Sequence, residues 1–237
     1  MSSCKTARTM PPMAEAMTAQ VRVVPAVLSP QRCAEWLDTV EHCAAALPSG
    51  HADLQAASGS LRLQALGRAR FISMLGTVAA ALGSCLPREA RCLTAQCWAR
   101  RQHPPASRPA GQSPHGWHQD GALHSRFTAS PDDALLAMTT VWIPLVDCGD
   151  EAPSLEWIDA PLPALIAPGD LLPVAERHAD RARQARLAAG DALVFGGALL
   201  HRTHVTPRMS RRRVSLEWRF VGGDPQPTRL AHEPREP

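Results

Sequence analysis

Three His-x-Asp triplets, at residues 51–53, 118–120 and 178–180, could each offer an imidazole and a carboxylate to one metal ion. In extended backbone, residues two apart point to the same side, so both side chains of a triplet can reach one ion. With one distant histidine, a triplet would complete the two-histidine, one-carboxylate set of non-haem Fe(II) sites, which leaves positions open for a cosubstrate and O₂. A triplet alone is a weak signal, so its surroundings decide between the three.

The surroundings favour the triplet at 118–120. The triplet at 178–180 falls in a predicted helix, where residues two apart point about 200° away from each other and cannot share an ion. The triplet at 51–53 lies in a polar loop. His118 and Asp120 instead lie in GWHQDGA, with glycines on both sides and a Pro/Gly-rich loop before them. The alternative for this triplet is a surface turn in which Asp120 caps a nearby amide.

A second histidine for the same ion follows the segment GDALVFGGALLHRTH. This segment predicts a turn, a strand and a short connection that ends at His201. If the strands close a barrel, His201 can lie beside the first pair, and His204 is its rival for that place. His115 and His124 flank the triplet, and we interpret both as ordinary loop histidines.

Arginines at 211–213 open the segment RRRVSLEWRF, in which Arg213, Ser215, Glu217 and Arg219 alternate. In a strand these four side chains share one face. A cosubstrate such as 2-oxoglutarate chelates iron through its 2-oxo acid end and needs a bidentate donor for its far carboxylate, for which arginine is better suited than lysine. A buried arginine beside a hydroxyl is a candidate clamp, whereas any single arginine of the run could also belong to a solubilising edge strand.

Composition indicates one globular domain and excludes several classes of protein. The chain has 237 residues, of which 45% are hydrophobic and 20% charged, enough for a buried core. A net charge of only +3 and the absence of tyrosine argue against a nucleic-acid partner. No apolar run is long enough to span a membrane and no secretory signal is evident, so we expect a cytoplasmic protein without a membrane partner. Seven cysteines without a CxxC pair favour reduced thiols over a zinc site.

The first part of the chain predicts mostly helices. Residues 21–28 are β-branched and predict a short edge strand because of Pro25. Ser29 and Pro30 form an N-cap followed by a proline at the first helical position, which predicts a helix to about Leu47. The other expected elements are a loop at 48–60, an amphipathic helix at 62–83, a strand at 92–101 and a Pro/Gly/Ser loop at 104–116.

The second part predicts mostly strands, at 134–146, 155–158, 192–195 and 211–221, with a helix at 175–187. Helices early and strands late favour a mainly β sandwich or barrel with N-terminal helices packed on one side. We expect a flexible N-terminus at 1–20, one domain at 21–223 with its β core at about 92–222, and a flexible C-terminal tail at 224–237.

These motifs resemble those of the phytanoyl-CoA dioxygenase family of Fe(II)/2-oxoglutarate oxygenases. The resemblance rests on GWHQDGAL at 116–123, VWIPLVDCGDEAPSLEWI at 141–158 and GDALVFGGALLHRTHVTPRMSRRRVSLEWRF at 190–220, and covers about residues 92–222. It implies a double-stranded β-helix (jelly-roll) core that binds Fe(II), 2-oxoglutarate and O₂. It also implies an enzyme that oxidises a small organic substrate with release of succinate and CO₂.

The resemblance assigns roles to particular residues. It implies His118, Asp120 and His201 as the metal ligands. For the far carboxylate of 2-oxoglutarate, the usual spacing of eleven residues after the last ligand points to Arg212. The R-x-S-x-E-x-R pattern points instead to Arg213, which we favour because Ser215 then shares its face; Arg211 also stays open. The resemblance further implies Thr203 as a hydroxyl that assists this carboxylate, Trp142 as an aromatic lining of the cosubstrate pocket, and Gln119 as a residue facing the site.

The same resemblance bears on the type of reaction. Related halogenases replace the carboxylate ligand with alanine or glycine so that chloride can bind. Because Asp120 is present, hydroxylation, desaturation or ring formation is favoured over halogenation. We expect the loops around 104–134 and the N-terminal helices to form the substrate pocket, but they carry no motif that names the substrate or an oligomeric state.

Three alternatives stay open at the level of sequence. Nucleic-acid demethylases of the same oxygenase class also place two arginines six apart on a strand, as Arg213 and Arg219 are, but the low net charge argues against one. A cupin-like metal protein would more often carry three or four histidines and a glutamate in two compact motifs, which this sequence lacks. A jelly-roll module without catalysis would fail to bind 2-oxoglutarate. An RNA-binding or assembly protein could use the arginine run alone.

Overall fold

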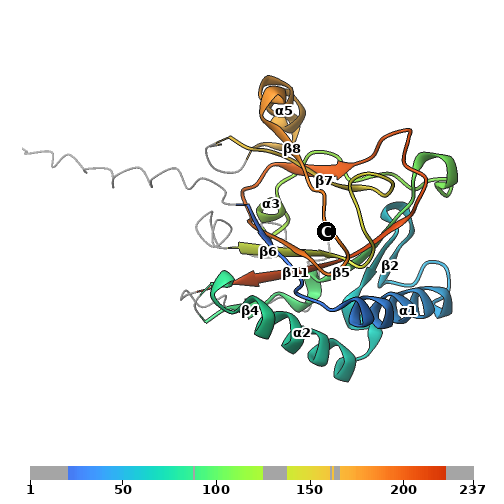
Figure 1. Cartoon of the computed structure of the whole chain (residues 1–237). Helices are drawn as coiled ribbons and strands as arrows, with labels where there is room; N and C mark the ends of the chain where they lie inside the picture. The colour runs from blue at the N-terminus through green and yellow to red at the C-terminus, as the bar shows by residue number, and fades with distance from the viewer. Residues whose placement is uncertain (1–20, 88, 125–137, 161, 163–165, 223–237) are drawn as a thin grey trace, which may run out of the picture.

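The computed structural model describes most of the chain (Figure 1). The described residues are 21–87, 89–124, 138–160, 162 and 166–222. The ends that we predicted to be flexible, 1–20 and 224–237, lie outside them, as do the side chain of His124 and the first part of the strand predicted at 134–146.

Two antiparallel sheets face each other. The larger sheet has the order β1 (Arg22–Val24), β9 (Ala192–Gly196), β6 (Met138–Pro144), β11 (Arg213–Val221), β5 (Trp98–Gln102), β3 (Ser60–Arg62) and β2 (Leu54–Gln55), and β4 (Arg91–Cys92) also pairs with β11. The smaller sheet has the order β10 (His201–His204), β7 (Ser154–Ile158) and β8 (Ala182–Gln184). In Figure 1 the smaller sheet lies above β6, β11 and β5. This arrangement confirms the predicted mainly β, jelly-roll fold with N-terminal helices.

The two long helices, α1 (Pro30–Ala46) and α2 (Arg68–Leu82), cover the outer face of the larger sheet (Figure 1). As predicted, the hydroxyl of Ser29 caps α1 by accepting a hydrogen bond from the backbone N–H of Arg32. Trp36 of α1 and Phe71 of α2 are buried in one apolar cluster with the outward side chains of β6 and β11. No helix among the described residues is long and apolar enough to cross a membrane.

Strand β11 separates the apolar core from the polar interior. Val214, Leu216, Trp218 and Phe220 alternate onto the outer face and join the cluster under the helices. The intervening side chains, those of 213, 215, 217 and 219, are buried on the opposite face, between the sheets. The strand is therefore buried along both faces, because the helices cover one face of the larger sheet and the smaller sheet covers the other.

Several predicted elements end or break where the sequence pattern did not show it. The loop predicted at 48–60 contains the pairing strands β2 and β3, and the helix predicted from 62 begins only at Arg68, after a 3₁₀ turn at Leu63–Leu66 and Gly67 with a φ of 93°. The strand predicted at 92–101 is interrupted by a 3₁₀ turn at Thr94–Gln96.

The helix predicted at 175–187 is largely wrong. Helix α5 (Leu171–Arg177) ends at Arg177 and is followed by a 3₁₀ turn at Ala179–Arg181 and by β8. Strand β8 pairs with β7 of the smaller sheet. Tertiary pairing of this kind overrides the helical propensity of an arginine- and alanine-rich segment.

Gly190 packs against Leu28, just before the first helix, and accepts a hydrogen bond from its N–H over 3.0 Å. Its replacement by alanine should destabilise the fold. Its φ is 88°, and a Cβ at this position would overlap the carbonyl oxygen of Leu28. We expect Gly190→Ala to lower the free energy of unfolding by about 2 kcal/mol, measured by urea denaturation. Gly169→Ala is the matched control, because a Cβ there meets open space. An equal effect of the two substitutions would contradict the strain at Gly190.

Candidate metal centre

His118 and His201 are neighbours because their backbones pair. The N–H of His118 donates to the carbonyl of His201 over 2.9 Å, and the N–H of His201 donates to the carbonyl of His118 over 3.0 Å. This bridge joins the segment before α3 (Asp120–His124) to the start of β10. Because directly paired residues hold their side chains close together, the two rings lie with their centroids 4.2 Å apart.

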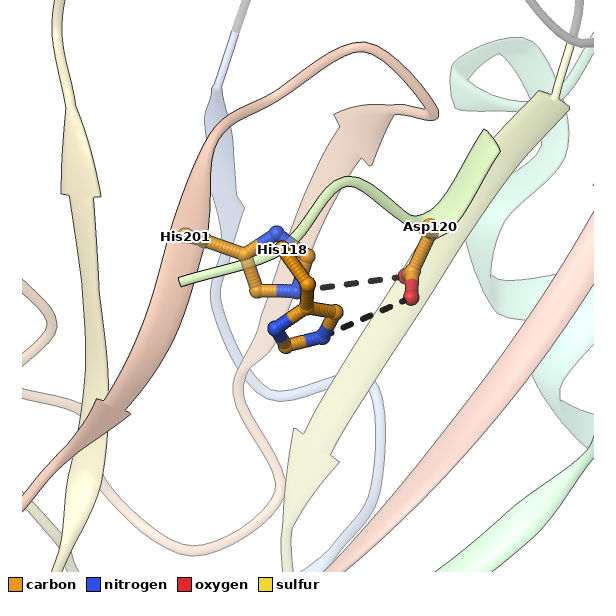
Figure 2. A group of neighbouring side chains, drawn as sticks. All are labelled: His118, Asp120 and His201. Atoms are coloured by element: carbon orange, nitrogen blue, oxygen red, sulfur yellow. Dashed lines mark ion pairs between the residues drawn. The ribbon is translucent and has the colours of Figure 1, made fainter. Parts of the chain in front are cut away.

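Asp120 completes a three-residue cluster (Figure 2). One carboxylate oxygen lies 3.8 Å from Nε2 of His118, and the other lies 4.0 Å from Nε2 of His201. One ligand atom from each of the three residues lies within 4.8 Å of the other two. Asp120 and His201 are buried, whereas His118 is half-buried.

Both imidazoles are oriented by backbone carbonyls. Nδ1 of His118 lies 2.7 Å from the carbonyl oxygen of Gly116, and Nδ1 of His201 lies 2.9 Å from that of Leu199. A ring whose Nδ1–H donates to a carbonyl keeps its Nε2 lone pair free for a metal. Burial and the neighbouring His201 lower the pKa of His118 to about 3, so this ring is neutral near pH 7.

The carboxylate of Asp120 is held by two side chains that lie opposite each other in the larger sheet. Arg219 of β11 donates to one oxygen over 2.6 Å, and the hydroxyl of Thr140 of β6 donates to the other over 2.7 Å. Arg219 and Thr140 are direct register partners. Burial opposes ionisation, but Arg219 and the two histidines hold the pKa of Asp120 well below its usual range. The cluster therefore offers two imidazoles and one carboxylate, a donor set that suits Fe(II).

The other two triplets do not form such a cluster. Within the described part of the chain, His118, Asp120 and His201 make up the group with metal-ligand geometry. In the triplet at 51–53, Nδ1 of His51 lies 3.9 Å from a carboxylate oxygen of Asp53, and both side chains are partly exposed. The triplet at 178–180 begins at the C-cap residue of α5 and continues into the 3₁₀ turn at Ala179–Arg181.

A pocket opens beside the cluster, between the two sheets. Part of its wall is apolar and comes from Trp142, Leu155 and Phe195. The polar side chains that line it are Arg100, His115, His118, Asp120, Thr140, His201, Thr203 and Glu217. Thr203 and Trp142, which the family resemblance implied as cosubstrate contacts, both line this pocket. The two N-terminal helices do not contribute to this wall; they pack on the far face of the sheet, which corrects our expectation that they help to form the pocket.

Arg213 lies in the interior without a carboxylate partner among the described residues. Its guanidinium lies 5.3 Å from the centroid of the Trp142 ring and donates to the backbone carbonyl of Ser154 over 3.1 Å. Its Nε, the hydroxyl of Ser215 and the indole N–H of Trp142 are buried and unbonded in the part of the chain that the structure describes. Burial lowers the pKa of Arg213 to about 10. A buried cation beside idle polar groups is a cradle shaped for a carboxylate.

The neighbouring arginines point outward. Arg212 lies at the surface with its guanidinium 2.7 Å from Glu41 of α1, and Arg211 is exposed and lies 3.8 Å from Glu151. Of the three arginines that the sequence left open, only Arg213 faces the interior.

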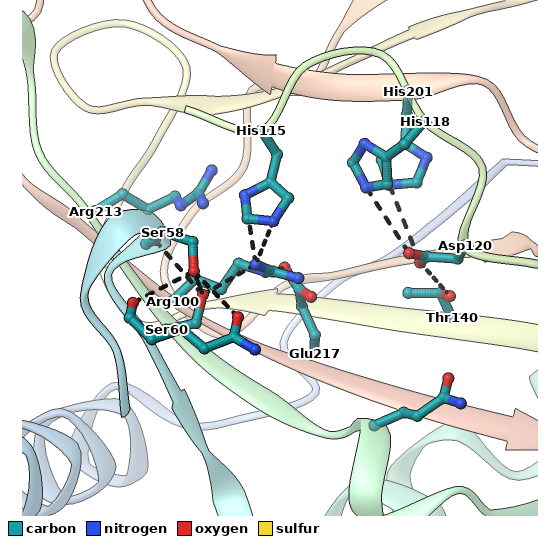
Figure 3. Close-up of polar contacts among 12 residues, drawn as sticks. Ser58, Ser60, Arg100, His115, His118, Asp120, Thr140, His201, Arg213 and Glu217 are labelled. Carbon is teal, nitrogen blue, oxygen red and sulfur yellow. Dashed lines mark hydrogen bonds and ion pairs between the residues drawn. The ribbon is translucent and has the colours of Figure 1, made fainter. Parts of the chain in front are cut away.

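Arg100 and His115 also line the pocket (Figure 3), although no sequence pattern predicted a role for Arg100 and we interpreted His115 as an ordinary loop residue. Arg100 pairs with the buried carboxylate of Glu217, and one of its terminal nitrogens lies 2.9 Å from Nε2 of His115. Burial and Arg100 lower the pKa of His115 to about 4, so its ring is neutral. A charged residue next to the end of the strand predicted at 92–101 was the available signal for Arg100.

Two other candidates lie away from the metal cluster. His204 lies 3.6 Å from Glu156, on the side of β10 away from His201. The side-chain amide of Gln119 does not face the pocket: it donates to the carbonyl of Ala198 over 2.6 Å and accepts a hydrogen bond from the N–H of Ile166 over 2.7 Å. Gln119 therefore braces backbone segments around the site, which corrects the expectation that it faces the metal.

Comparison with known proteins identifies relatives of this arrangement. A family model described as phytanoyl-CoA dioxygenase (PhyH) matches residues 21–213. No curated protein matches the chain in a sequence search.

Similar solved structures share the fold at low sequence identity. One is the non-haem alpha-ketoglutarate-dependent epimerase SnoN from nogalamycin biosynthesis, with a TM-score of 0.61, 17% identity and coverage of 86% of this chain and 78% of SnoN. HygX from Streptomyces hygroscopicus, with nickel and 2-oxoglutarate bound, has a TM-score of 0.59, 14% identity and coverage of 86% and 83%. EctD from S. alaskensis, with 2-oxoglutarate and 5-hydroxyectoine, has a TM-score of 0.59, 16% identity and coverage of 86% and 73%.

Proposed function

Since the chain belongs to the phytanoyl-CoA dioxygenase family of Fe(II)- and 2-oxoglutarate-dependent oxygenases, we propose that His118, Asp120 and His201 hold its iron. The observation that carries this proposal is that one ligand atom from each of these residues lies within 4.8 Å of the other two. Asp120 and His201 are 81 residues apart in the sequence, so only the fold brings them together. Two imidazoles and one carboxylate are donors that a divalent metal takes in such sites.

The cradle around Arg213 fits the far carboxylate of 2-oxoglutarate. The guanidinium would supply the charge, and the hydroxyl of Ser215 and the indole of Trp142 are unbonded donors beside it. Thr203 lines the pocket from β10, two residues after His201, and is a further donor for the same group. Trp142, which stacks beside Arg213, and Thr203 line the same pocket as the metal cluster, as a single five-carbon cosubstrate requires.

When bound, iron couples the oxidative decarboxylation of 2-oxoglutarate to succinate and CO₂ with the oxidation of a substrate by O₂. The chain supplies position, charge and exclusion of water. Arg219 and Thr140 hold the carboxylate of Asp120, backbone carbonyls orient both imidazoles, and the apolar wall of Trp142 and Phe195 excludes water. A metal-bound carboxylate favours hydroxylation, or a related desaturation or ring formation, over halogenation.

A small organic molecule is the substrate that we propose. The similar structures include an epimerase of nogalamycin biosynthesis and a complex of EctD with 5-hydroxyectoine, both of which concern small molecules. The partly apolar pocket between the sheets, with a few convergent polar groups, is consistent with such a substrate.

Anaerobic addition of Fe(II) and 2-oxoglutarate tests the proposal. We expect a weak visible charge-transfer band that needs both components, and slow formation of succinate when O₂ is admitted without substrate. Mixing with Fe(II) and succinate is the control. A protein that binds Fe(II) but gives neither the band nor succinate would not be an oxygenase of this type.

Arg219 should set the metal affinity without touching the metal. It orients Asp120 and also donates to the carbonyl of Gln96 over 2.6 Å. Loss of such an orienting partner typically weakens metal binding about 10- to 100-fold. We therefore expect Arg219→Met to weaken Co(II) binding by about this factor in calorimetric titration. If Arg219→Met does not fold, Arg219→Lys keeps the positive charge at this position and should show a smaller loss of Co(II) affinity. Wild-type Co(II) affinity in a folded Arg219→Met protein would contradict this role.

A further inference from the structure

Arg100 occupies a central place on the floor of the pocket. In the sheet register it lies between Ser60 of β3 and Ser215 of β11. Along β11, Arg213 precedes Ser215 by two residues and Glu217 follows it by two, so all three side chains lie on the same inward face. Figure 3 shows His115 above Arg100, with Arg213 to one side and the metal cluster to the other. A ligand that spans the cradle and the metal would therefore pass Arg100.

The guanidinium of Arg100 is held in place but not saturated. Its Nε pairs with Glu217, and one terminal nitrogen donates to the hydroxyl of Ser60 over 2.9 Å and lies 2.9 Å from Nε2 of His115. The other terminal nitrogen has no hydrogen-bond partner among the described residues. The side chain is only 9% exposed, and it lines the pocket. A fixed, buried guanidinium with a free edge is suited to binding an anion.

The charges of the pocket interior do not balance. Three guanidinium groups, of Arg100, Arg213 and Arg219, face two carboxylates, of Asp120 and Glu217, among the described buried residues. Fe(II) and the 2-oxoglutarate dianion carry equal and opposite charges, so their binding leaves the surplus positive charge in place. An uncompensated charge in a dry site is costly, and a further anionic group would remove that cost.

A purely structural role explains Arg100 poorly. Replacing a buried ion pair by apolar residues is often neutral or stabilising, so the pair with Glu217 is weak evidence of a contribution to stability. Arg219 also contacts Glu217, over 3.4 Å, which means that the carboxylate has a second cation near it. Arg100 lines the pocket itself, where its guanidinium can contact a ligand.

We propose that Arg100, oriented by Glu217 and assisted by His115, binds a second carboxylate in the pocket, that of the organic substrate. The inference rests on the proposed 2-oxoglutarate site, since it assigns that site's substrate to the class of carboxylic acids. A carboxylate could also come from the inner, 2-oxo acid end of the cosubstrate, and the experiment separates the two sources.

The experiment uses Co(II)-loaded protein and isothermal titration in two arms. The first arm measures the dissociation constant of 2-oxoglutarate. The second arm saturates the protein with 2-oxoglutarate and titrates acetate and benzoate, each compared with its neutral amide. We expect wild type to bind the acids at least tenfold more tightly than the amides. In Arg100→Met this preference should disappear, while the 2-oxoglutarate constant changes less than threefold.

The variants make each outcome decisive. Arg101→Met is the matched control: it lies on the same strand but faces the other way, 3.7 Å from Glu41, and should behave as wild type. The double variant Arg100→Met/Glu217→Gln removes both charges if the single variant does not fold.

A tenfold or greater loss of 2-oxoglutarate affinity in Arg100→Met, with no acid preference in wild type, would overturn the assignment to the substrate, because Arg100 would then bind the cosubstrate. An acid preference that persists in Arg100→Met would overturn it as well. Unchanged 2-oxoglutarate binding together with no acid preference in wild type would overturn the inference. Failure of wild type itself to bind 2-oxoglutarate would instead refute the proposed function.

Discussion

Asp120→Ala is expected to abolish succinate formation and to weaken Co(II) or Fe(II) binding by at least about 100-fold. Loss of a residue that only orients a ligand costs about 10- to 100-fold in affinity, so loss of the ligand itself should cost more. The substitution also leaves the buried guanidinium of Arg219 without its main carboxylate, and breaking a buried pair costs about 3–5 kcal/mol. Asp120→Asn keeps the shape of the side chain and separates this loss of stability from the loss of metal binding.

The chain contains its own control for this experiment. Asp53→Ala removes the aspartate of another His-x-Asp triplet, one that is partly exposed and lies 3.5 Å from Arg62. It should leave metal affinity and succinate formation as in wild type. Calorimetric titration of the metal and quantification of succinate check both variants. Equal metal affinity of Asp120→Asn and wild type would show that the ion binds elsewhere.

Arg213→Met should weaken 2-oxoglutarate binding by at least about 30-fold, because loss of one partner of a buried charge pair costs about 2 kcal/mol or more. The same variant should be as stable as wild type, or more stable, when no cosubstrate is present. The reason is that Arg213 is a buried cation whose own pKa is depressed by burial and that has no carboxylate partner among the described residues. Titration with 2-oxoglutarate and thermal unfolding without it measure the two effects.

Arg212→Met distinguishes the two assignments that the sequence left open. Arg212 has the family's usual spacing from His201, but its guanidinium faces Glu41 at the surface. We expect this variant to bind 2-oxoglutarate as wild type does. If Arg212→Met lost the cosubstrate and Arg213→Met kept it, the assignment of the cradle would be wrong.

The sequence predicted the fold and the metal cluster for a clear physical reason. Alternation along strands and a capped helix are local patterns, and His-x-Asp followed by a distant histidine is a motif with few structural solutions. The spatial bridge between His118 and His201 could not be read from the chain, yet the motif implied that the two residues would meet. The elements that failed, such as the helix predicted beyond residue 177, failed where sheet pairing outweighs local propensity.

The partners of these residues could not be predicted in the same way. Arg219 meets Asp120 across 99 positions, and Arg100 meets Glu217 across 117. Such pairs are set by the register between strands rather than by any local pattern. The choice between Arg212 and Arg213 likewise depends on the register of β11, because a shift of one residue exchanges the two faces of a strand.

The placement of the charged side chains on β11 makes assembly of the active site an all-or-none event. A one-residue slip of this strand would bring Val214, Leu216 and Trp218 into the pocket and send Arg213, Glu217 and Arg219 against the helices. A misaligned molecule could hold neither the cosubstrate nor the oriented aspartate. Metal and 2-oxoglutarate, by binding only the correctly aligned chain, would then act on folding yield as well as on catalysis, in proportion to their concentrations relative to their dissociation constants.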